Sequence, residues 1–264
     1  MPVTVPPEWL AALEARHLAD LRLPEVTRAL RALSSAYVER RRALARGGAL
    51  DTAGKRAAFA LFYAPLHYLT VGLILEALRP RVPQTIVDLG CGTGAAGAAW
   101  AMRCDREPRL LGLDRHPWAV EEARWTYRHL RLAGRAKQAD VSRFQPPRAD
   151  VGCIAAYVLN ELPDEARATL LASLVDLARR GGRVLILEPI ARRLTPWWDA
   201  ARAQVEAAGG RADEWDVLLD LPPLLATLDR AAGLNHTRLK ARSLFVTGSL
   251  RETRAAPPAR TPTY

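Results

Sequence analysis

Cysteine, histidine and lysine are scarce in this chain of 264 residues, and the first two shortages bear on disulfide and metal chemistry. The three cysteines, Cys91, Cys104 and Cys153, are unevenly spaced and form no C-x-x-C pair, which indicates neither a disulfide framework nor a zinc site. The five histidines are scattered without ligand spacing, so we expect no metal. This cysteine usage is typical of a reducing compartment, and we expect a cytoplasmic protein.

Long apolar runs are also missing. The longest candidate, residues 68–78, contains Gly72 and Glu76 and falls short of the ~20 residues that a membrane span needs. Residues 1–7 lack the basic start and apolar core of a secretory signal. We therefore expect no membrane association.

Lysine makes up only three of the 38 basic residues, so arginine supplies most of the positive charge behind the net +10. The excess is spread along the chain, and abundant arginine, alanine and proline are as typical of a GC-rich genome as of an RNA-binding protein. One cluster is concentrated, at residues 40–42 with Arg46, Lys55 and Arg56. It is interpreted either as a solvated helix end or as an RNA contact.

What the chain does contain is a short apolar strand followed by alternating glycines, Ile86-Val87-Asp88-Leu89-Gly90-Cys91-Gly92-Thr93-Gly94. The strand ends in an acid, and the glycines let the backbone turn sharply and approach a ligand. The alanine-rich residues 95–102 then begin a helix. Such a unit binds nucleoside ligands at the carboxyl end of the strand. It contains no phosphate loop, and its dinucleotide pattern G-x-G-x-x-G is only a loose one, at Gly92, Gly94 and Gly97.

Further apolar runs follow in order at residues 110–114, 137–141, 150–156 and 181–189, separated by helical segments. Repeated βα units of this kind predict a parallel sheet. Two of the runs end in or near acids, Asp114 and Asp140. A carboxylate at Asp114 can accept both hydroxyls of a ribose. Taken singly, Asp114 is also explained as a helix cap and Asp140 as a turn residue.

The motif D-L-G-C-G-T-G at residues 88–94, with the acids after it, resembles the class I S-adenosylmethionine-dependent methyltransferases over residues 59–248. The resemblance implies an α/β, Rossmann-like fold with a seven-stranded, mostly parallel sheet, and S-adenosyl-L-methionine as cofactor. It assigns the methionine moiety to Asp88 and the glycine turn, the ribose to Asp114 and the adenine to Asp140. With their neighbours, the implied cofactor residues are Asp88, Gly90, Cys91, Gly92, Gly94, Asp114, Arg115, Asp140, Val141 and Tyr157.

In the resembled family the loop after the fourth strand lies beside the methyl group. Tyr157, Asn160 and Glu161 are therefore the candidate catalytic residues. The loop reads L-N-E-L-P, whereas amine methyltransferases that act on bases often show [DN]-P-P-[YF] here. Glu161 is either a general base or a first-turn acid of a helix at residues 163–179.

Residues 1–80 predict an N-terminal helical extension, with helices at 8–20, 24–44 and 56–78. The third helix is rich in aromatic residues around Pro65. This pattern fits a core helix kinked by the proline and also a lid that brings substrate-binding residues over the site. The candidate substrate-binding residues are Tyr63, His67 and Tyr68, together with Trp197 and Trp198, which alternatively pack the start of an amphipathic helix.

We expect residues 81–250 to form the S-adenosylmethionine-binding domain, with a helix at 221–233 and a closing antiparallel strand pair at 235–248. Residues 251–264 are expected to be a disordered tail. The predicted function is methyl transfer to a small-molecule O or N acceptor. The helical front end and the L-N-E-L loop are also similar to methyltransferase-like proteins of small ribosomal subunit assembly, whose usual cysteine clusters are missing here. The alternative is therefore an rRNA methyltransferase, or an assembly factor that binds S-adenosylmethionine without catalysis.

Overall fold

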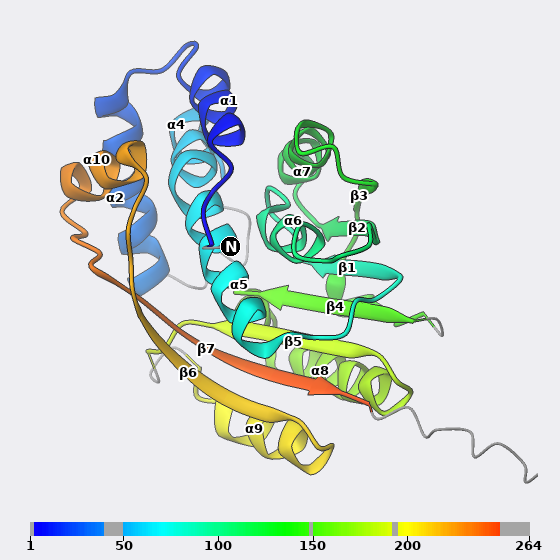
Figure 1. Cartoon of the computed structure of the whole chain (residues 1–264). Coiled ribbons are helices and arrows are strands. Elements are labelled where there is room, and N and C mark those ends of the chain that lie inside the picture. The colour runs from blue at the N-terminus through cyan, green and yellow to red at the C-terminus, as the bar shows by residue number, and fades with distance from the viewer. Residues whose placement is uncertain (1–2, 40–49, 148–149, 192–194, 249–264) are drawn as a thin grey trace, which may run out of the picture.

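The computed structural model describes residues 3–39, 50–147, 150–191 and 195–248. Their core is one seven-stranded sheet in the order β3-β2-β1-β4-β5-β7-β6, with helices on both faces (Figure 1). Strand β7 alone runs in the opposite direction to the other strands and pairs antiparallel with β5 and β6. The prediction of a seven-stranded, mostly parallel sheet is confirmed. The strands are β1 (Thr85–Leu89), β2 (Arg109–Asp114), β3 (Gly134–Gln138), β4 (Val151–Ala156), β5 (Arg183–Glu188), β6 (Arg211–Leu218) and β7 (Arg238–Thr247).

The helices divide between the two faces of the sheet and an N-terminal group. Helices α5, α6 and α7 lie on one face, α8 and α9 cover the other, and α1, α2 and α4 gather beside the sheet together with α10 (Figure 1). Their bounds are α1 (Pro7–His17), α2 (Leu23–Glu39), α4 (Ala53–Ala58), α5 (Ala64–Leu78), α6 (Ala95–Ala101), α7 (Pro117–His129), α8 (Asp164–Arg179), α9 (Trp198–Ala207) and α10 (Pro223–Ala232). Short 3-10 turns are η2 (Val141–Arg143) and η3 (Leu159–Glu161), and a π-helical turn is η1 (Phe59–Tyr63).

The central strands are buried on both faces, as their continuous apolar sequences predict. Successive residues of a strand point to opposite faces. Accordingly Ile86 and Leu185 join the core under α6, while Val87 and Ile186 join the core under α8 and α9.

Helices α4, η1 and α5 form one continuous helix, and its π-helical turn lies immediately before Pro65. Proline has no N–H to donate to the carbonyl four residues earlier, and its ring would crowd that carbonyl. The chain widens there instead, and the Ala64 N–H bonds to the carbonyl of Phe59. Residues 53–78 are long and apolar enough to cross a membrane by composition, but 72% of their most apolar window is buried in the protein. They therefore form a core helix, as one of the two interpretations of this segment holds.

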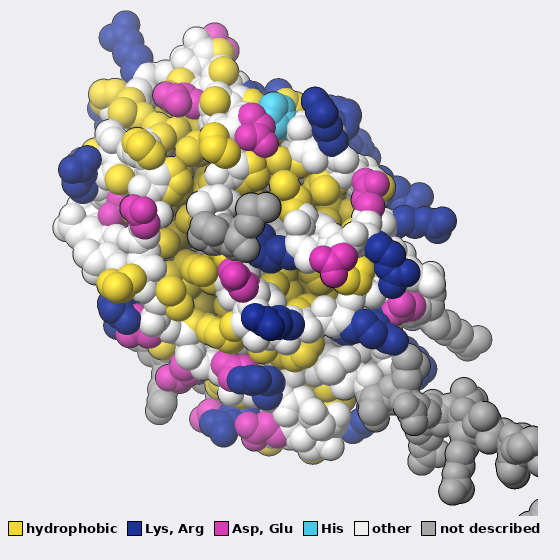
Figure 2. All heavy atoms as spheres, in the orientation of Figure 1, with side chains coloured by type: hydrophobic (Ala, Val, Ile, Leu, Met, Phe, Trp, Pro, Cys, Tyr) yellow, Lys and Arg dark blue, Asp and Glu magenta, His cyan; other side chains and the backbone are white. Residues whose placement is uncertain are grey.

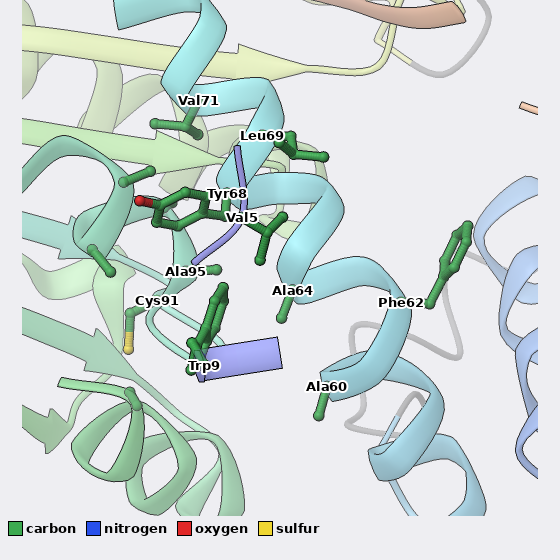
Figure 3. Close-up of a cluster of buried hydrophobic side chains, with 14 of the residues drawn as sticks. Val5, Trp9, Ala60, Phe62, Ala64, Tyr68, Leu69, Val71, Cys91 and Ala95 are labelled. Carbon is green, nitrogen blue, oxygen red and sulfur yellow. The ribbon is translucent and has the colours of Figure 1, made fainter. Parts of the chain in front are cut away.

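The N-terminal helices contact the sheet domain through buried side chains and through hydrogen bonds to Glu122 of α7. Val5 and Trp9 pack between Tyr68 of α5 and the turn that carries Cys91, where Trp9 is fully buried (Figure 3). The carboxylate of Glu122 on α7, 1% exposed, accepts hydrogen bonds from Arg16 Nε at 3.1 Å and His17 Nε2 at 2.8 Å on α1.

Two predicted elements are wrong. The strand expected at residues 137–141 is β3 at Gly134–Gln138, so Asp140 follows the strand and caps η2. Residues 235–248 do not form a strand pair; they supply the single strand β7, which lies between β5 and β6. The partner β6 was missed because its sequence, RADEWDVL, is highly charged and partly exposed along its length. The basic residues 40–42 and 46, the end predicted for the second helix and the tail at 251–264 lie outside the described residues.

Candidate functional site

A cavity of about 420 Å³ opens at the carboxyl ends of β1, β2 and β4, where open α/β sheets bind their ligands. Helices α2, η1 and α5 close its other side. The residues lining it are Ser34, Leu50, Phe59, Tyr63, His67, Gly90, Cys91, Gly92, Thr93, Ala95, Ala96, Asp114, Arg115, His116, Ala139, Asp140, Val141, Ala156, Tyr157, Val158, Asn160, Glu161, Leu162 and Pro189. The cavity thus joins the predicted cofactor turn to the predicted acceptor loop.

The glycine turn, residues 90–94, needs its glycines. Gly90 and Gly92 have φ of 63° and 52°, in the left-handed region that favours glycine. A Cβ on Gly90 would come within 2.5 Å of Val158, and one on Gly92 would meet the Phe59 ring at 3.3 Å. At these two glycines the turn therefore presents only backbone to its surroundings, and Gly92 lies against the ring of Phe59 on η1.

Asp114 at the end of β2 is fixed by the backbone. One carboxylate oxygen accepts the Gly92 N–H at 2.9 Å, and the other accepts the His116 N–H at 2.8 Å. His116 is the N-cap of α7 and Pro117 its first residue. Each carboxylate oxygen keeps a further lone pair for a ligand in the cavity.

These residues fit an adenosyl cofactor. Asp114 presents a pre-oriented carboxylate, and the glycine turn leaves room where side chains would intrude. Thr93, 1% exposed, also lines the cavity with a hydroxyl that has no partner among the described residues. A buried hydroxyl of this kind is costly unless a ligand satisfies it.

Two predicted cofactor residues do not line the cavity. Asp88 is 1% exposed and points beneath α6, where it accepts the Gly97 N–H at 2.8 Å. Burial raises the pKa of this carboxyl to about 7. Gly94 caps α6, and a Cβ there would meet Tyr127. Asp88 and Gly94 therefore lie outside the lining of the cavity. The structure does not support the prediction that they contact the methionine moiety directly.

The adenine end of the predicted site lies at η2. Asp140 and Val141 both line the cavity there, and Asp140 accepts the Ser142 N–H at 2.9 Å as the cap of η2. Arg115 lines it as well, and its guanidinium lies 3.7 Å from the carboxylate of Glu161. This ion pair spans the cavity rim between the β2 and β4 loops.

The β4 loop, residues 157–162, is held in an unusual conformation. Tyr157 has φ of 64°, which is strained for a bulky residue. Its N–H bonds to the Leu187 carbonyl at 2.8 Å, its hydroxyl bonds to Thr70, and its ring stacks on His67 with centroids 4.5 Å apart. The N–H of Asn160 donates to the buried carboxylate of Glu188 at 3.1 Å. The loop is therefore anchored to both β5 and α5.

The carboxyl of Glu161 has a raised pKa. Burial among surrounding protein atoms raises the pKa of its carboxyl to about 7, against the opposing effect of Arg115. The side chain is 40% exposed and lines the cavity. A carboxylate whose pKa lies near the working pH is suited to act as a general base.

The helical wall of the cavity is aromatic. Phe59, Tyr63 and His67 follow one another at intervals of four residues, with ring centroids 6.0 to 6.1 Å apart. Burial lowers the pKa of His67 to about 4, so its imidazole is neutral at pH 7. Together with Tyr157 these residues are called the aromatic wall below.

The other three predicted substrate residues lie elsewhere. Tyr68 is 2% exposed and packs on Trp9, with its hydroxyl toward the Met102 sulfur. Trp198 is buried under Arg242, and Trp197 lies against Arg167. None of the three lines the cavity, because their side chains are used in packing, so we do not retain them as substrate residues.

Sequence reasoning did not assign Phe59, Thr93 or Glu188 to the site. Phe59 shares its four-residue spacing with Tyr63 and His67, and this spacing was the available signal. Nothing local marks Glu188, because its role depends on the neighbouring β4 loop. Among the described residues no group of three or more histidines, cysteines or acids could hold a metal ion.

The central part of the chain is similar in sequence to known methyltransferases. Residues 86–182 match the family described as Methyltransferase domain. Over 116 residues, 44% of this chain and 42% of the relative, the sequence is 36% identical to a trans-aconitate 2-methyltransferase of Methylobacterium radiotolerans. It is 30% identical to the aklanonic acid methyltransferase DauC of Streptomyces sp. over 45% of this chain and 54% of that protein. The chain spans about half the length of the curated relatives it matches.

Solved structures are similar at a lower level of identity. The mitomycin 7-O-methyltransferase MmcR aligns with a TM-score of 0.49 and 17% identity, over 94% of this chain and 74% of that one. Magnesium protoporphyrin IX methyltransferase of Synechocystis PCC 6803, solved with bound SAH, aligns with a TM-score of 0.47 and 18% identity, over 70% and 84% of the two chains.

Proposed function

We propose that this chain, whose residues 86–182 match the family described as Methyltransferase domain, is a class I S-adenosylmethionine-dependent methyltransferase that transfers a methyl group to the oxygen of a small-molecule acceptor. The observation that carries the proposal is the single cavity that joins the glycine turn and Asp114 to the β4 loop and the aromatic wall. A donor site and an acceptor site in one space are what direct transfer requires.

S-Adenosylmethionine, when bound, supplies an activated methyl group on a sulfonium. In the proposal, Asp114 holds the ribose, the glycine turn with Thr93 accommodates the amino-acid end, and Asp140 with Val141 borders the adenine. The rigid β4 loop aligns the acceptor. An acceptor oxygen that gains a methyl group gives up its proton, and the Glu161 carboxylate is the group we propose to take it.

A small-molecule acceptor is favoured over RNA by the cavity and by the relatives of this chain. On the face shown in Figure 2, the basic and acidic side chains of the described residues are intermixed around the margin and form no large patch of one sign. The relatives named above include enzymes named for small organic acids. A cytoplasmic location, in keeping with the free thiols of Cys91, Cys104 and Cys153, is part of the same proposal.

Labelled S-adenosylmethionine and fractionated cell extract test the proposal. Label in the low-molecular-weight fraction supports it. Label in RNA, or no label anywhere while calorimetry shows cofactor binding, contradicts it and favours an RNA-modifying or non-catalytic role. The Glu161→Gln variant is expected to bind cofactor normally and to transfer label more slowly, whereas wild-type rates would remove Glu161 as the base.

A further inference from the structure

We propose that the acceptor is a flat aromatic hydroxy compound, neutral when it binds, whose ring stacks on the aromatic wall. The inference rests on the proposed methyl transfer and names the class of acceptor for that cavity. It depends on the arrangement of Phe59, Tyr63, His67 and Tyr157.

The wall presents rings in a fixed arrangement. Phe59 and His67 meet edge to face at 82°, and His67 and Tyr157 are stacked at 28°. Tyr63 lies at 6.0 Å from both Phe59 and His67. Aromatic side chains prefer edge-to-face or offset partners at centroid distances of about 4.5–7 Å, so a planar ring in the cavity finds suitable faces and edges here.

Two of the rings are held by hydrogen bonds to neighbouring side chains. The Tyr157 hydroxyl bonds to Thr70, whose own hydroxyl donates to the Leu66 carbonyl at 2.8 Å. The Tyr63 hydroxyl bonds to Ser34. Because these partners fix the rings before any ligand arrives, little side-chain entropy is lost when an acceptor stacks on them.

The wall also lies beside the donor site. Phe59 approaches the backbone of Gly92 closely enough that a Cβ there would meet its ring at 3.3 Å. Tyr157 continues the wall onto the β4 loop, which carries Glu161. A ring on the wall is therefore flanked by the cofactor turn on one side and by the proposed base on the other.

The aromatic wall itself carries no charge at pH 7. The titratable groups facing His67 are the phenols of Tyr63 on its own helix and Tyr157 on the β4 loop, with Glu188 behind Tyr157. Both phenols are neutral at pH 7, because burial raises their pKa values to about 12. Burial also disfavours the imidazolium form of His67, so the wall offers an acceptor no charged partner. A neutral hydroxyl acceptor suits such a wall: the oxygen bonds to the methyl carbon as the carbon–sulfur bond breaks, its proton leaves to Glu161, and a neutral ether remains.

Three probes of similar size separate the possibilities: 2-naphthol, its saturated counterpart trans-2-decalol, and the cation 2-naphthylmethylammonium. Calorimetry measures their binding to the protein with and without saturating S-adenosylhomocysteine, so that no turnover is needed. We expect 2-naphthol to bind about 10-fold more tightly than either other probe. Equal binding of decalol, preference for the ammonium, or no naphthol binding in either condition overturns the inference.

Variants locate the binding surface. Tyr63→Leu is expected to weaken naphthol binding about 10-fold, while Tyr63→Phe, which keeps the ring, retains it. Trp125→Leu, on α7 and outside the cavity lining, is the matched control. Unchanged naphthol affinity in folded Tyr63→Leu overturns the assignment, and if that variant fails to unfold cooperatively, Phe59→Leu replaces it. S-Adenosylhomocysteine binding by the wild type is scored separately, so failure of the cofactor site is distinguished from failure of the acceptor class. Methylation of RNA without naphthol binding overturns the inference as well.

Discussion

Asp114→Ala is the perturbation that most directly tests the cofactor site. The carboxylate of Asp114 lines the cavity and is oriented by the N–H groups of Gly92 and His116, at 2.9 and 2.8 Å. In the proposed complex it also accepts two ribose hydroxyls. Removing it therefore affects both the ligand and the turn that holds the ligand.

The expected loss follows from those bonds. Hydrogen bonds to charged groups contribute about 1.5–3 kcal/mol each. Because Asp114 is only half-buried, the lower figure applies, and two lost bonds cost ~3 kcal/mol, or roughly a 100-fold weaker complex. The two N–H groups also lose their acceptor, which is expected to cost about 1–2 kcal/mol of folding stability.

Calorimetric titration with S-adenosylhomocysteine measures the first effect, and thermal or urea unfolding measures the second. Asp114→Asn keeps the size and one acceptor oxygen and is expected to fall between Ala and wild type. Asp105→Ala, an exposed acid after α6 and outside the cavity, is the control. Wild-type affinity in a folded Asp114→Ala protein would refute the assignment of Asp114 to the cofactor.

Three further outcomes follow from titratable groups. Because Glu161 must be ionised to act as a base, kcat/KM for methyl transfer should rise with pH through about 7 and level off above it, and Glu161→Gln should lose this limb; a flat wild-type profile argues against the role. Burial acts to raise the pKa of Glu122, but hydrogen bonds from His17 and Arg16 outweigh this effect and hold the pKa below its usual value. The Glu122 carboxylate therefore stabilises the fold above pH ~4.5, and this stabilisation is lost as the pH falls through the lowered pKa. Glu122→Gln should therefore cost ~1–3 kcal/mol at pH 7 in urea unfolding, a deficit that shrinks in acid; a deficit independent of pH would contradict the ionic role. For Asp88 the folded pKa is raised to about 7, so the protein should lose stability as pH rises from about 4 to 7; Asp88→Asn should flatten that slope, and an unchanged slope would show that another group causes it.

Strand-by-strand reasoning worked where local sequence and tertiary environment agree. The apolar runs before Asp88 and Asp114 are buried on both faces, so their hydrophobicity identifies them without any partner. Strand β6 is different. Its charged, half-exposed sequence gains strand geometry only by pairing with β7 along its whole length.

Chemistry at the site divides in the same way. The glycine turn and Asp114 could be placed from sequence, because φ values above zero and a carboxylate at a strand end are local requirements. Asp88 shows the limit: the strand position predicts a ligand contact, but its face of β1 lies under α6, and the carboxylate binds Gly97 instead.

By itself, then, the sequence determined the βα order, the glycine turn and the family model that residues 86–182 match, because each depends on residues adjacent in the chain. Only the tertiary structure decided which aromatic residues face the cavity. The π-helical turn before Pro65 and the fold of α5 across the sheet place Tyr63 and His67 beside the β4 loop, and bury Tyr68 against Trp9. Tyr63, His67 and Tyr68 are close in sequence. Helical phase and partners from distant segments decide that the first two line the cavity while Tyr68 is buried in the core.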